Sequence, residues 1–448
     1  MKKIRSSYRT WRFRATWPCR LAAAVLVLGV PAGIWPQALV PQDAAAEPRE
    51  LPVGVRINSV SAWVGRNYLL APNAAGTPIQ SYTLGYGGGV DAGLYLAGRT
   101  SRASLDYSLG YNGTPTYAEL NGFDHNLSFS WTRSLRRTFS LSVKGTAESI
   151  TVAGFLFQPV VNSAPDLSNA GALAGSLASV GTAGATQTIL YPGRRQTATA
   201  AATLSHSASR RLSWQLGMHA QRLLPSSSSD PSTQQKTGYP GATTDGVDLS
   251  LSYSLSRRTS VGAEASYFRT VSQLGGMQAG AGGFSMTRVL SRRWFGSAQV
   301  GYGLGDYSTA ASKTSVLRPD FTGRATLGTS IDAHMLTVSA GQRLGDSYGF
   351  GAQRTTDASL AWTWHPRQQK WSFQATGAYE WLTGLEASKI QSAVFRGFLT
   401  RRLTGTLSCA VEGGYMWGLS NSGSLNLGQQ NQNGLRLSLV WRPGGTLW

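Results

Sequence analysis

The chain has few charged residues, almost no cysteine and no long hydrophobic stretch. Charged side chains make up 14% of its 448 residues, compared with about 25% in ordinary globular proteins. Beyond the first 46 residues, no apolar run reaches the ~18 residues that a membrane-spanning helix needs. The first shortage argues against a set of ordinary soluble domains. The lack of a long apolar run excludes a helical membrane protein.

The chain is instead rich in glycine and aromatic residues and strongly basic. It contains 53 Gly, 14 Trp and 17 Tyr, and its net charge is +20. A basic balance often indicates nucleic-acid binding. The secretory signal and the alternating strands described below argue against that partner here.

The first 46 residues have the order of a secretory signal peptide. A basic segment precedes the apolar stretch Leu21–Val30, and small residues at 44–46 offer a cleavage site. We therefore expect residues 1–46 to be removed and residues 47–448 to form one domain. Of the two cysteines only Cys409 then remains, which leaves no intrachain disulfide.

The segment Trp371–Trp381 shows the pattern that dominates the rest of the chain. Its apolar residues, with aromatics at both ends, occupy every second position, and polar residues occupy the others. This period of two is typical of a β-strand with one apolar face. A strand of about ten residues at ~3.3 Å per residue, tilted by ~40°, matches the ~25 Å apolar band of an outer-membrane barrel.

Short turns and longer polar loops alternate along the chain. The turns centre on Arg99–Arg102, Arg136–Arg137, Arg210–Arg211, Arg257–Arg258, Arg292–Arg293, Asp332–His334, Pro366–Gln369 and Arg401–Arg402. The longer loops are expected at 114–122, 225–244, 308–319 and 420–433. Eight turns flanked by sixteen strands, with one further strand at each end, predict eighteen strands. Sixteen is the alternative, because Val53–Leu70 is less regular.

The mature chain resembles bacterial outer-membrane β-barrels of the porin-like class. The resemblance is carried by the repeated hairpins and by the closing strand, in which Gly434, Leu437, Leu439 and Trp441 match the assembly signal of that class. Seven residues follow Trp441, whereas the signal usually ends the chain. The resemblance implies an all-β fold: a transmembrane antiparallel up-and-down barrel with periplasmic turns and extracellular loops.

Two further features follow from the alternation. An aromatic girdle at the membrane surfaces is expected from Trp214, Trp294, Trp371, Tyr379, Trp381, Tyr415, Trp417 and Trp441. The charged residues of the opposite parity are expected to line the bore and to set solute selectivity, or to brace the wall as cross-strand pairs. They are Asp91, Asp106, Lys144, Glu148, Asp248, Glu264, Arg324, Arg343, Glu380, Glu412 and Arg436.

The longest insertion, at 158–193, is a candidate constriction of the bore. Within it Leu173 and Leu177 fall at helical spacing, so a short helix is expected, with Asp166 or Ser168 as its N-terminal cap. The resemblance implies the same, since the third loop of general porins folds inward at this place. A loop on the extracellular surface is the alternative.

The sequence contains no set of residues that indicates catalysis. His219 has the inward parity beside Gln215 and Gln221, with no acidic partner at a regular spacing. No metal-binding, nucleotide-binding or nucleophile motif occurs, so we predict no enzyme activity and no cofactor.

Three functions are compatible with such a barrel. The first is a porin-like channel for passive or moderately selective passage of small polar or anionic solutes. The second is an exopolysaccharide secretion pore of the alginate-export type, and the third a structural or adhesive surface barrel. In each case the partners are outer-membrane lipid, lipopolysaccharide and the barrel-assembly machinery, with no nucleic acid. The oligomeric state stays open.

The parity of the strand around Cys409 yields a testable prediction. Cys409 shares its face with Leu407 and Val411, so we expect its thiol to face lipid. A water-soluble maleimide should then label Cys409 slowly in intact membranes and quickly after unfolding. Rapid labelling of the membrane-embedded protein would contradict this orientation.

Overall fold

A computed structural model of the chain describes most of the region from residue 53 to residue 443. The described residues are 53–72, 78–115, 121–152, 193–225, 228–229, 236–237, 241–272, 275–309, 316–346, 352–364, 366, 370–384, 389–422 and 425–443. The expected signal peptide at 1–46 and the candidate constriction residues Asp166, Leu173 and Leu177 lie outside them. No helix among the described residues is long and apolar enough to cross a membrane.

The described residues form β-strands joined by turns. The strands are β1 (Val53–Pro72), β2 (Pro78–Ala97), β3 (Ser101–Gly113), β4 (Gly122–Arg136), β5 (Phe139–Val152), β6 (Gly193–Ser207), β7 (Leu212–Leu224), β8 (Ser228–Ser229), β9 (Lys236–Thr237), β10 (Ala242–Ser254), β11 (Thr259–Ser272), β12 (Gly275–Val289), β13 (Trp294–Thr309), β14 (Val316–Ile331), β15 (His334–Asp346), β16 (Ala352–Trp364), β17 (Trp371–Gly384), β18 (Lys389–Arg402), β19 (Leu407–Ser422) and β20 (Leu425–Trp441).

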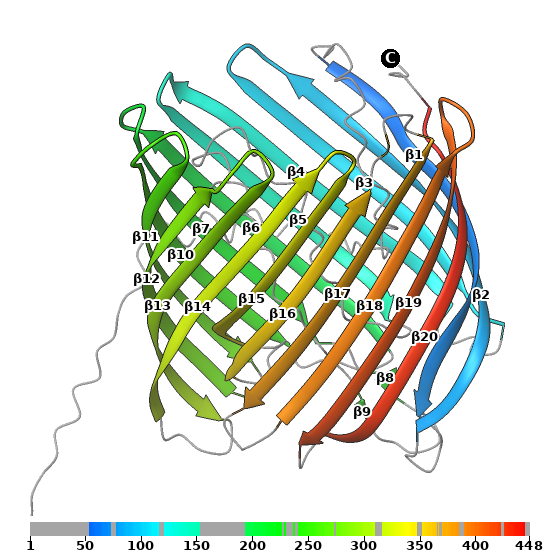
Figure 1. Cartoon of the computed structure of the whole chain (residues 1–448). Helices are drawn as coiled ribbons and strands as arrows, with labels where there is room; N and C mark the ends of the chain where they lie inside the picture. The colour runs from blue at the N-terminus through cyan, green and yellow to red at the C-terminus, as the bar shows by residue number, and fades with distance from the viewer. Residues whose placement is uncertain are drawn as a thin grey trace, which may run out of the picture. The chain divides into compact units, whose positions relative to one another are not determined.

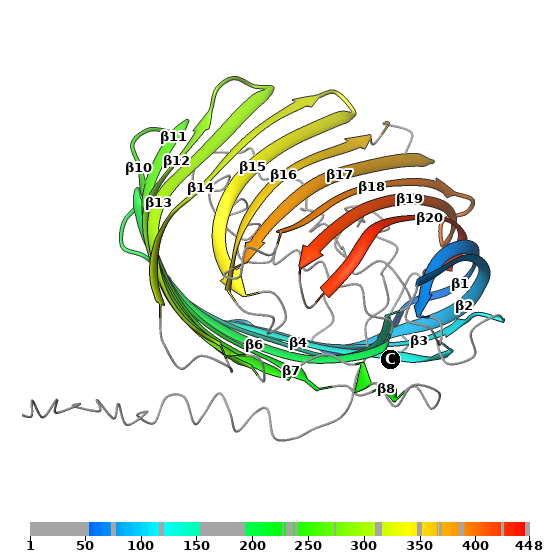
Figure 2. The same ribbon diagram turned by 90° about the horizontal axis from the view of Figure 1, so that it is seen from below.

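Eighteen of these strands form one closed antiparallel barrel, which confirms the predicted fold and strand number (Figures 1 and 2). Each strand pairs with its neighbour in sequence, apart from the small β8–β9 hairpin, which β7 and β10 bypass by pairing directly. Strands β1 and β20 close the ring from Val60↔Trp441 to Asn67↔Gly434. The predicted strand at Val53–Leu70 is therefore part of the barrel.

Seven of the eight predicted short turns lie among the described residues, each at or next to its predicted position, whereas most of Pro366–Gln369 lies outside them. In three of them a serine precedes the arginine pair, and its hydroxyl accepts backbone N–H bonds from the residues after it: Ser209, Ser256 and Ser291. Thr404 has the same role before β19. This local capping of the turn explains why Ser-Arg-Arg recurs, with the arginines left exposed to solvent.

One expected loop is largely strand. Residues 420–433 were predicted to be irregular, but β19 extends to Ser422 and β20 begins at Leu425, and the two pair across this region. The segment carries Gln and Asn at both odd and even positions. An alternating pattern arises only where one face meets an apolar environment, so a strand that is polar on both sides has no period-two signal.

The strands have an apolar outer face and a polar inner one. On β10, Leu249, Leu251 and Tyr253 are 40–48% exposed at alternate positions. Most girdle candidates belong to the same outer parity and are exposed, including Trp294, Trp371, Trp381 and Trp441. An outer band of this kind is stable only against lipid.

A β-bulge in β1 reverses the parity of that strand. Ile57 pairs with Ala92 and Ser59 with Asp91, which leaves Asn58 as the extra residue. Val53 and Val55 before the bulge, and Val64 after it, are exposed on the outer face. Trp63, which would point outward without the bulge, is 7% exposed and lies on the inner face.

The two faces of β10 provide a direct test of the register. We expect Leu249→Arg to lower the unfolding free energy by ~2–4 kcal/mol, because it places a charge in the hydrocarbon. The matched change Ser250→Arg on the inner face should have a much smaller effect. Urea titration of both variants, refolded in lipid vesicles, measures the difference. Equal costs at the two positions would contradict the assigned faces.

Candidate functional site: the charged inner wall

The structure places all eleven predicted bore residues on the inner parity of their strands. Ten of them fall into three groups and three separate pairs around the barrel, each held by cross-strand contacts. Lys144 is the exception: it is exposed opposite Ser130 and Ala201 on the neighbouring strands. Its ammonium group is therefore accessible to a solute in the bore.

The largest group is an ionic network across β14 to β17. The Arg324 guanidinium donates to both carboxylate oxygens of Asp357, at 2.8 and 2.7 Å. Arg343 lies between Asp357, at 3.9 Å, and Glu380, at 3.5 Å. Glu380 is completely buried. The network therefore balances two arginines against two acids and stiffens four adjacent strands.

A smaller branch of the wall joins Asp320 to its neighbours nearer the end of β14. The Asp320 carboxylate accepts a hydrogen bond from Gln342 at 3.1 Å and lies 3.8 Å from Arg354. The register pairs between β14 and β15 end at Gly323↔Gln342. These side chains thus connect β14 to β15 and β16 beyond the point where the backbone pairing of β14 with β15 stops.

A second group with excess positive charge crosses β18 to β20 and reaches β1. Glu412 is directly opposite Arg436 and interacts electrostatically with both Arg436 and Arg396. The Arg436 guanidinium stacks 4.1 Å from the centre of the Trp63 ring. Gly87 lacks a side chain under that indole: a Cβ there would lie 2.5 Å from Trp63 Nε1. Two arginines therefore share one acid on this side of the bore.

The first three strands carry a third group, dominated by acids. The Asp106 carboxylate accepts hydrogen bonds from the Tyr95 hydroxyl at 2.5 Å and from the Asn58 amide at 3.0 Å. Asn58 is the bulge residue of β1, so the bulge supplies this contact. Asp91 accepts a hydrogen bond from Ser59, and the Arg56 guanidinium stacks on Tyr95 at 4.2 Å.

The remaining predicted residues form three separate pairs. Glu148, which is buried, accepts a hydrogen bond from Arg195 at 2.8 Å. Gln299 donates to Glu264 at 2.8 Å. His219 Nδ1 lies 3.0 Å from Asp248 Oδ2, so the expectation that His219 has no acidic partner was wrong. The two residues are far apart in sequence, on β7 and β10, and only strand pairing brings them together.

Sequence reasoning missed several wall residues for identifiable reasons. Asp357 could have been found from the alternation of β16, because Leu360 and Trp362 are on the outer face and Asp357 has the opposite parity. Arg396 did not, because both faces of its strand carry aromatic residues: Phe395 is exposed and Phe398 is buried. Trp63 was missed because the bulge at Asn58 reverses its parity, which the sequence does not reveal. No group of His, Cys, Asp or Glu side chains in the described part of the chain could hold a metal ion.

Comparison with known proteins finds solved barrels of low similarity. No family model and no curated protein matches the sequence. The barrel resembles OccAB4 of Acinetobacter baumannii, with 9% identity and a TM-score of 0.43 over 88% of this chain and 99% of that one. It also resembles OccK2 (OpdF) of Pseudomonas aeruginosa, solved with glucuronate, with 10% identity and a TM-score of 0.45 over 87% of this chain and 98% of that one. The FrpB iron transporter of Neisseria meningitidis is 9% identical, with a TM-score of 0.45 over 83% of this chain and 62% of that one.

The balance of the β14–β17 network leads to a prediction. Asp357→Asn removes the acid that holds both Arg324 and Arg343, so we expect a loss of ~1–3 kcal/mol of unfolding free energy. The freed positive charge should also shift the reversal potential in a salt gradient toward anions. Asp332→Asn is the matched control: it removes the same charge from a turn outside the bore, at a φ of 52° that Asn tolerates. An identical shift in the control would show that bore position is irrelevant.

Proposed function

We propose that the chain forms an outer-membrane channel through which small polar solutes diffuse. The observation that carries this proposal is a closed eighteen-strand barrel with an apolar outer face and charged inner face. A barrel of 16–18 strands is too wide for inward side chains to fill, and it leaves an aqueous passage. Exposed charged groups on the inner face are hydrated by that passage, whereas the buried Glu148 and Glu380 are stabilised by arginine partners.

The wall charges support a channel that is moderately selective and that orients the solutes passing through it. Acids prevail on β2 to β11, with Asp91, Asp106 and Asp248, whereas Arg396 and Arg436 exceed their shared acid on β18 to β20. Opposed fields of this kind orient dipolar solutes and favour neither ion strongly. The solute class we propose is therefore small, polar and neutral or zwitterionic, with small anions passing along the arginine-rich side.

Polysaccharide export receives less support from the inner wall. A sugar polymer needs open aromatic faces on which its rings can stack. Among the described aromatics of inner parity, Trp63 is covered by Arg436 and Tyr95 by Arg56. Phe295 and Phe398 are 0% and 3% exposed, and the half-buried Phe268 packs against Met277 and Ala279. Each of these five rings is thus covered or packed against protein, which gives a polymer little aromatic surface.

Single-channel conductance of the refolded chain in a planar bilayer tests the proposal. We expect steady conductance with a cation-to-anion permeability ratio near unity, because both signs of charge line the wall. Swelling of liposomes that contain the barrel should then show entry of glycine and glucose. A folded, heat-modifiable barrel that gives no conductance would contradict the channel and favour a structural or adhesive role.

The long insertion is tested in the same assay by deletion of residues 160–190. The hypothesis of a constriction predicts a larger conductance after the deletion. An unchanged conductance would assign this insertion to the extracellular surface and leave the channel proposal intact.

A further inference from the structure

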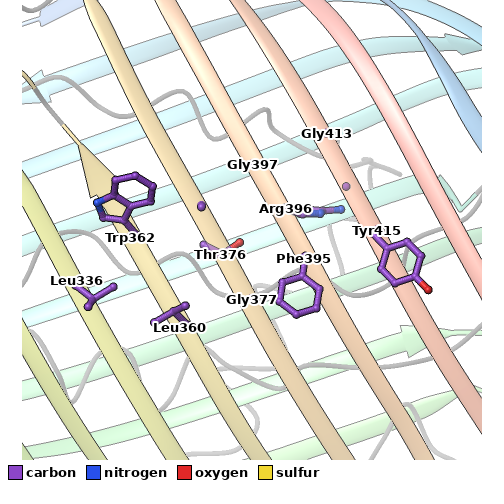
Figure 3. Close-up of a pocket in the computed structure, with 12 residues that line it drawn as sticks. Leu336, Leu360, Trp362, Thr376, Gly377, Phe395, Arg396, Gly397, Gly413 and Tyr415 are labelled. Atoms are coloured by element: carbon purple, nitrogen blue, oxygen red, sulfur yellow. The ribbon is translucent and has the colours of Figure 1, made fainter.

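The outer face of the barrel has a hollow in its apolar band, over β15 to β19. The hollow has a volume of about 520 Å³. Figure 3 shows Leu336, Leu360 and Trp362 along one side and Phe395 and Tyr415 along the other. We call this feature the outer groove. All five side chains are 37–58% exposed and belong to the lipid-facing parity.

Small residues on three adjacent strands make the floor of the outer groove. They are Ala375, Gly397 and Gly413. A Cβ at Gly397 would meet only Phe373 Cε2 at 3.9 Å, and one at Gly413 only Leu435 Cδ1 at 3.8 Å. Nothing within the fold therefore requires glycine at either position. Glycine weakens a strand, and it often marks a place where another molecule approaches the backbone.

A cationic site lies at the periplasmic end of the same strands. Trp371 and Arg401 are register partners on β17 and β18, and the Arg401 guanidinium stacks 5.0 Å from the Trp371 ring centre. Arg401 has the outer parity and is exposed. Lys370, in the turn just before Trp371, is exposed too. Ala375 and Gly397, a register pair, lie four positions further along these strands, or ~13 Å at ~3.3 Å per residue.

From this juxtaposition we infer that the outer groove and the Arg401 site together bind one anionic phospholipid of the periplasmic leaflet. The phosphate lies at Arg401 and Lys370, in the interfacial layer that Trp371 marks. One acyl chain extends along the glycine floor between Trp362 and Phe395. Charge complementarity selects the head group, and the depth of the groove holds the chain more tightly than a flat barrel wall does.

Native mass spectrometry of the delipidated, refolded chain tests this site. We expect phosphatidylglycerol to bind more tightly than phosphatidylcholine with the same acyl chains. Arg401→Gln should weaken phosphatidylglycerol binding about fivefold, the equivalent of ~1 kcal/mol per cationic side chain at a membrane surface. Gly397→Leu should weaken both lipids, because it fills the groove.

Matched controls separate this site from ordinary lipid contact. Arg402→Gln removes a neighbouring charge whose side chain bonds to the Gly405 carbonyl instead. Gly282→Leu fills an equally open outer position on β12, where a Cβ meets only Glu264 O at 3.8 Å. Both controls should bind phosphatidylglycerol as the parent does. Equal losses in variants and controls, or equal binding of the two lipids, would overturn the proposal.

Two further outcomes remain distinguishable. If Gly397→Leu does not fold, as shown by the absence of heat-modifiable migration, Gly413→Leu replaces it. If a groove variant changes the oligomeric mass while phosphatidylglycerol binding persists, the groove is an interface between copies and the lipid assignment is wrong. Conductance is expected to stay unchanged in every folded variant, so failure here leaves the channel proposal standing.

Discussion

The structure depends on satisfying every backbone N–H and C=O group of a strand that faces lipid. No water is present in the hydrocarbon to replace a missing partner, so a sheet in the membrane must close on itself. In this barrel closure rests on the pairing of β1 with β20 between Val60↔Trp441 and Asn67↔Gly434. The segment that matches the assembly signal is thus the one whose backbone completes the ring.

Closure also determines which side chains meet. Once the strands pair with their neighbours, inner positions on adjacent strands lie within reach of one another, and charged residues far apart in sequence become partners. Arg324, Asp357 and Glu380 come from β14, β16 and β17, yet Arg343 on β15 connects them into one network. The same wall that gives the bore its charge therefore also stiffens the barrel.

The outer face is governed by a different constraint, because lipid rewards apolar surface and tolerates no unpaired charge. Large aliphatic side chains occupy every second position in the middle of β10, from Val247 to Leu251, and near the end of β20, from Leu435 to Leu439. The outer groove departs from this pattern, because Gly397 and Gly413 form its floor. An exposed Arg401, stacked on the ring of the girdle residue Trp371, lies further along the same strands. The fold does not require these departures, and the proposed lipid site is based on them.

The class of fold, seven short turns of the described region and the inner parity of eleven charged residues could be predicted from the sequence, as could eighteen strands, with sixteen as the alternative. This was possible because alternation and turn chemistry are local and have a direct physical meaning. The partners, Asp248 for His219 and Arg195 for Glu148, emerge only from strand pairing, and so does the inward position of Trp63. Register between strands and the bulge at Asn58 are set by closure of the whole ring, and no local pattern records them.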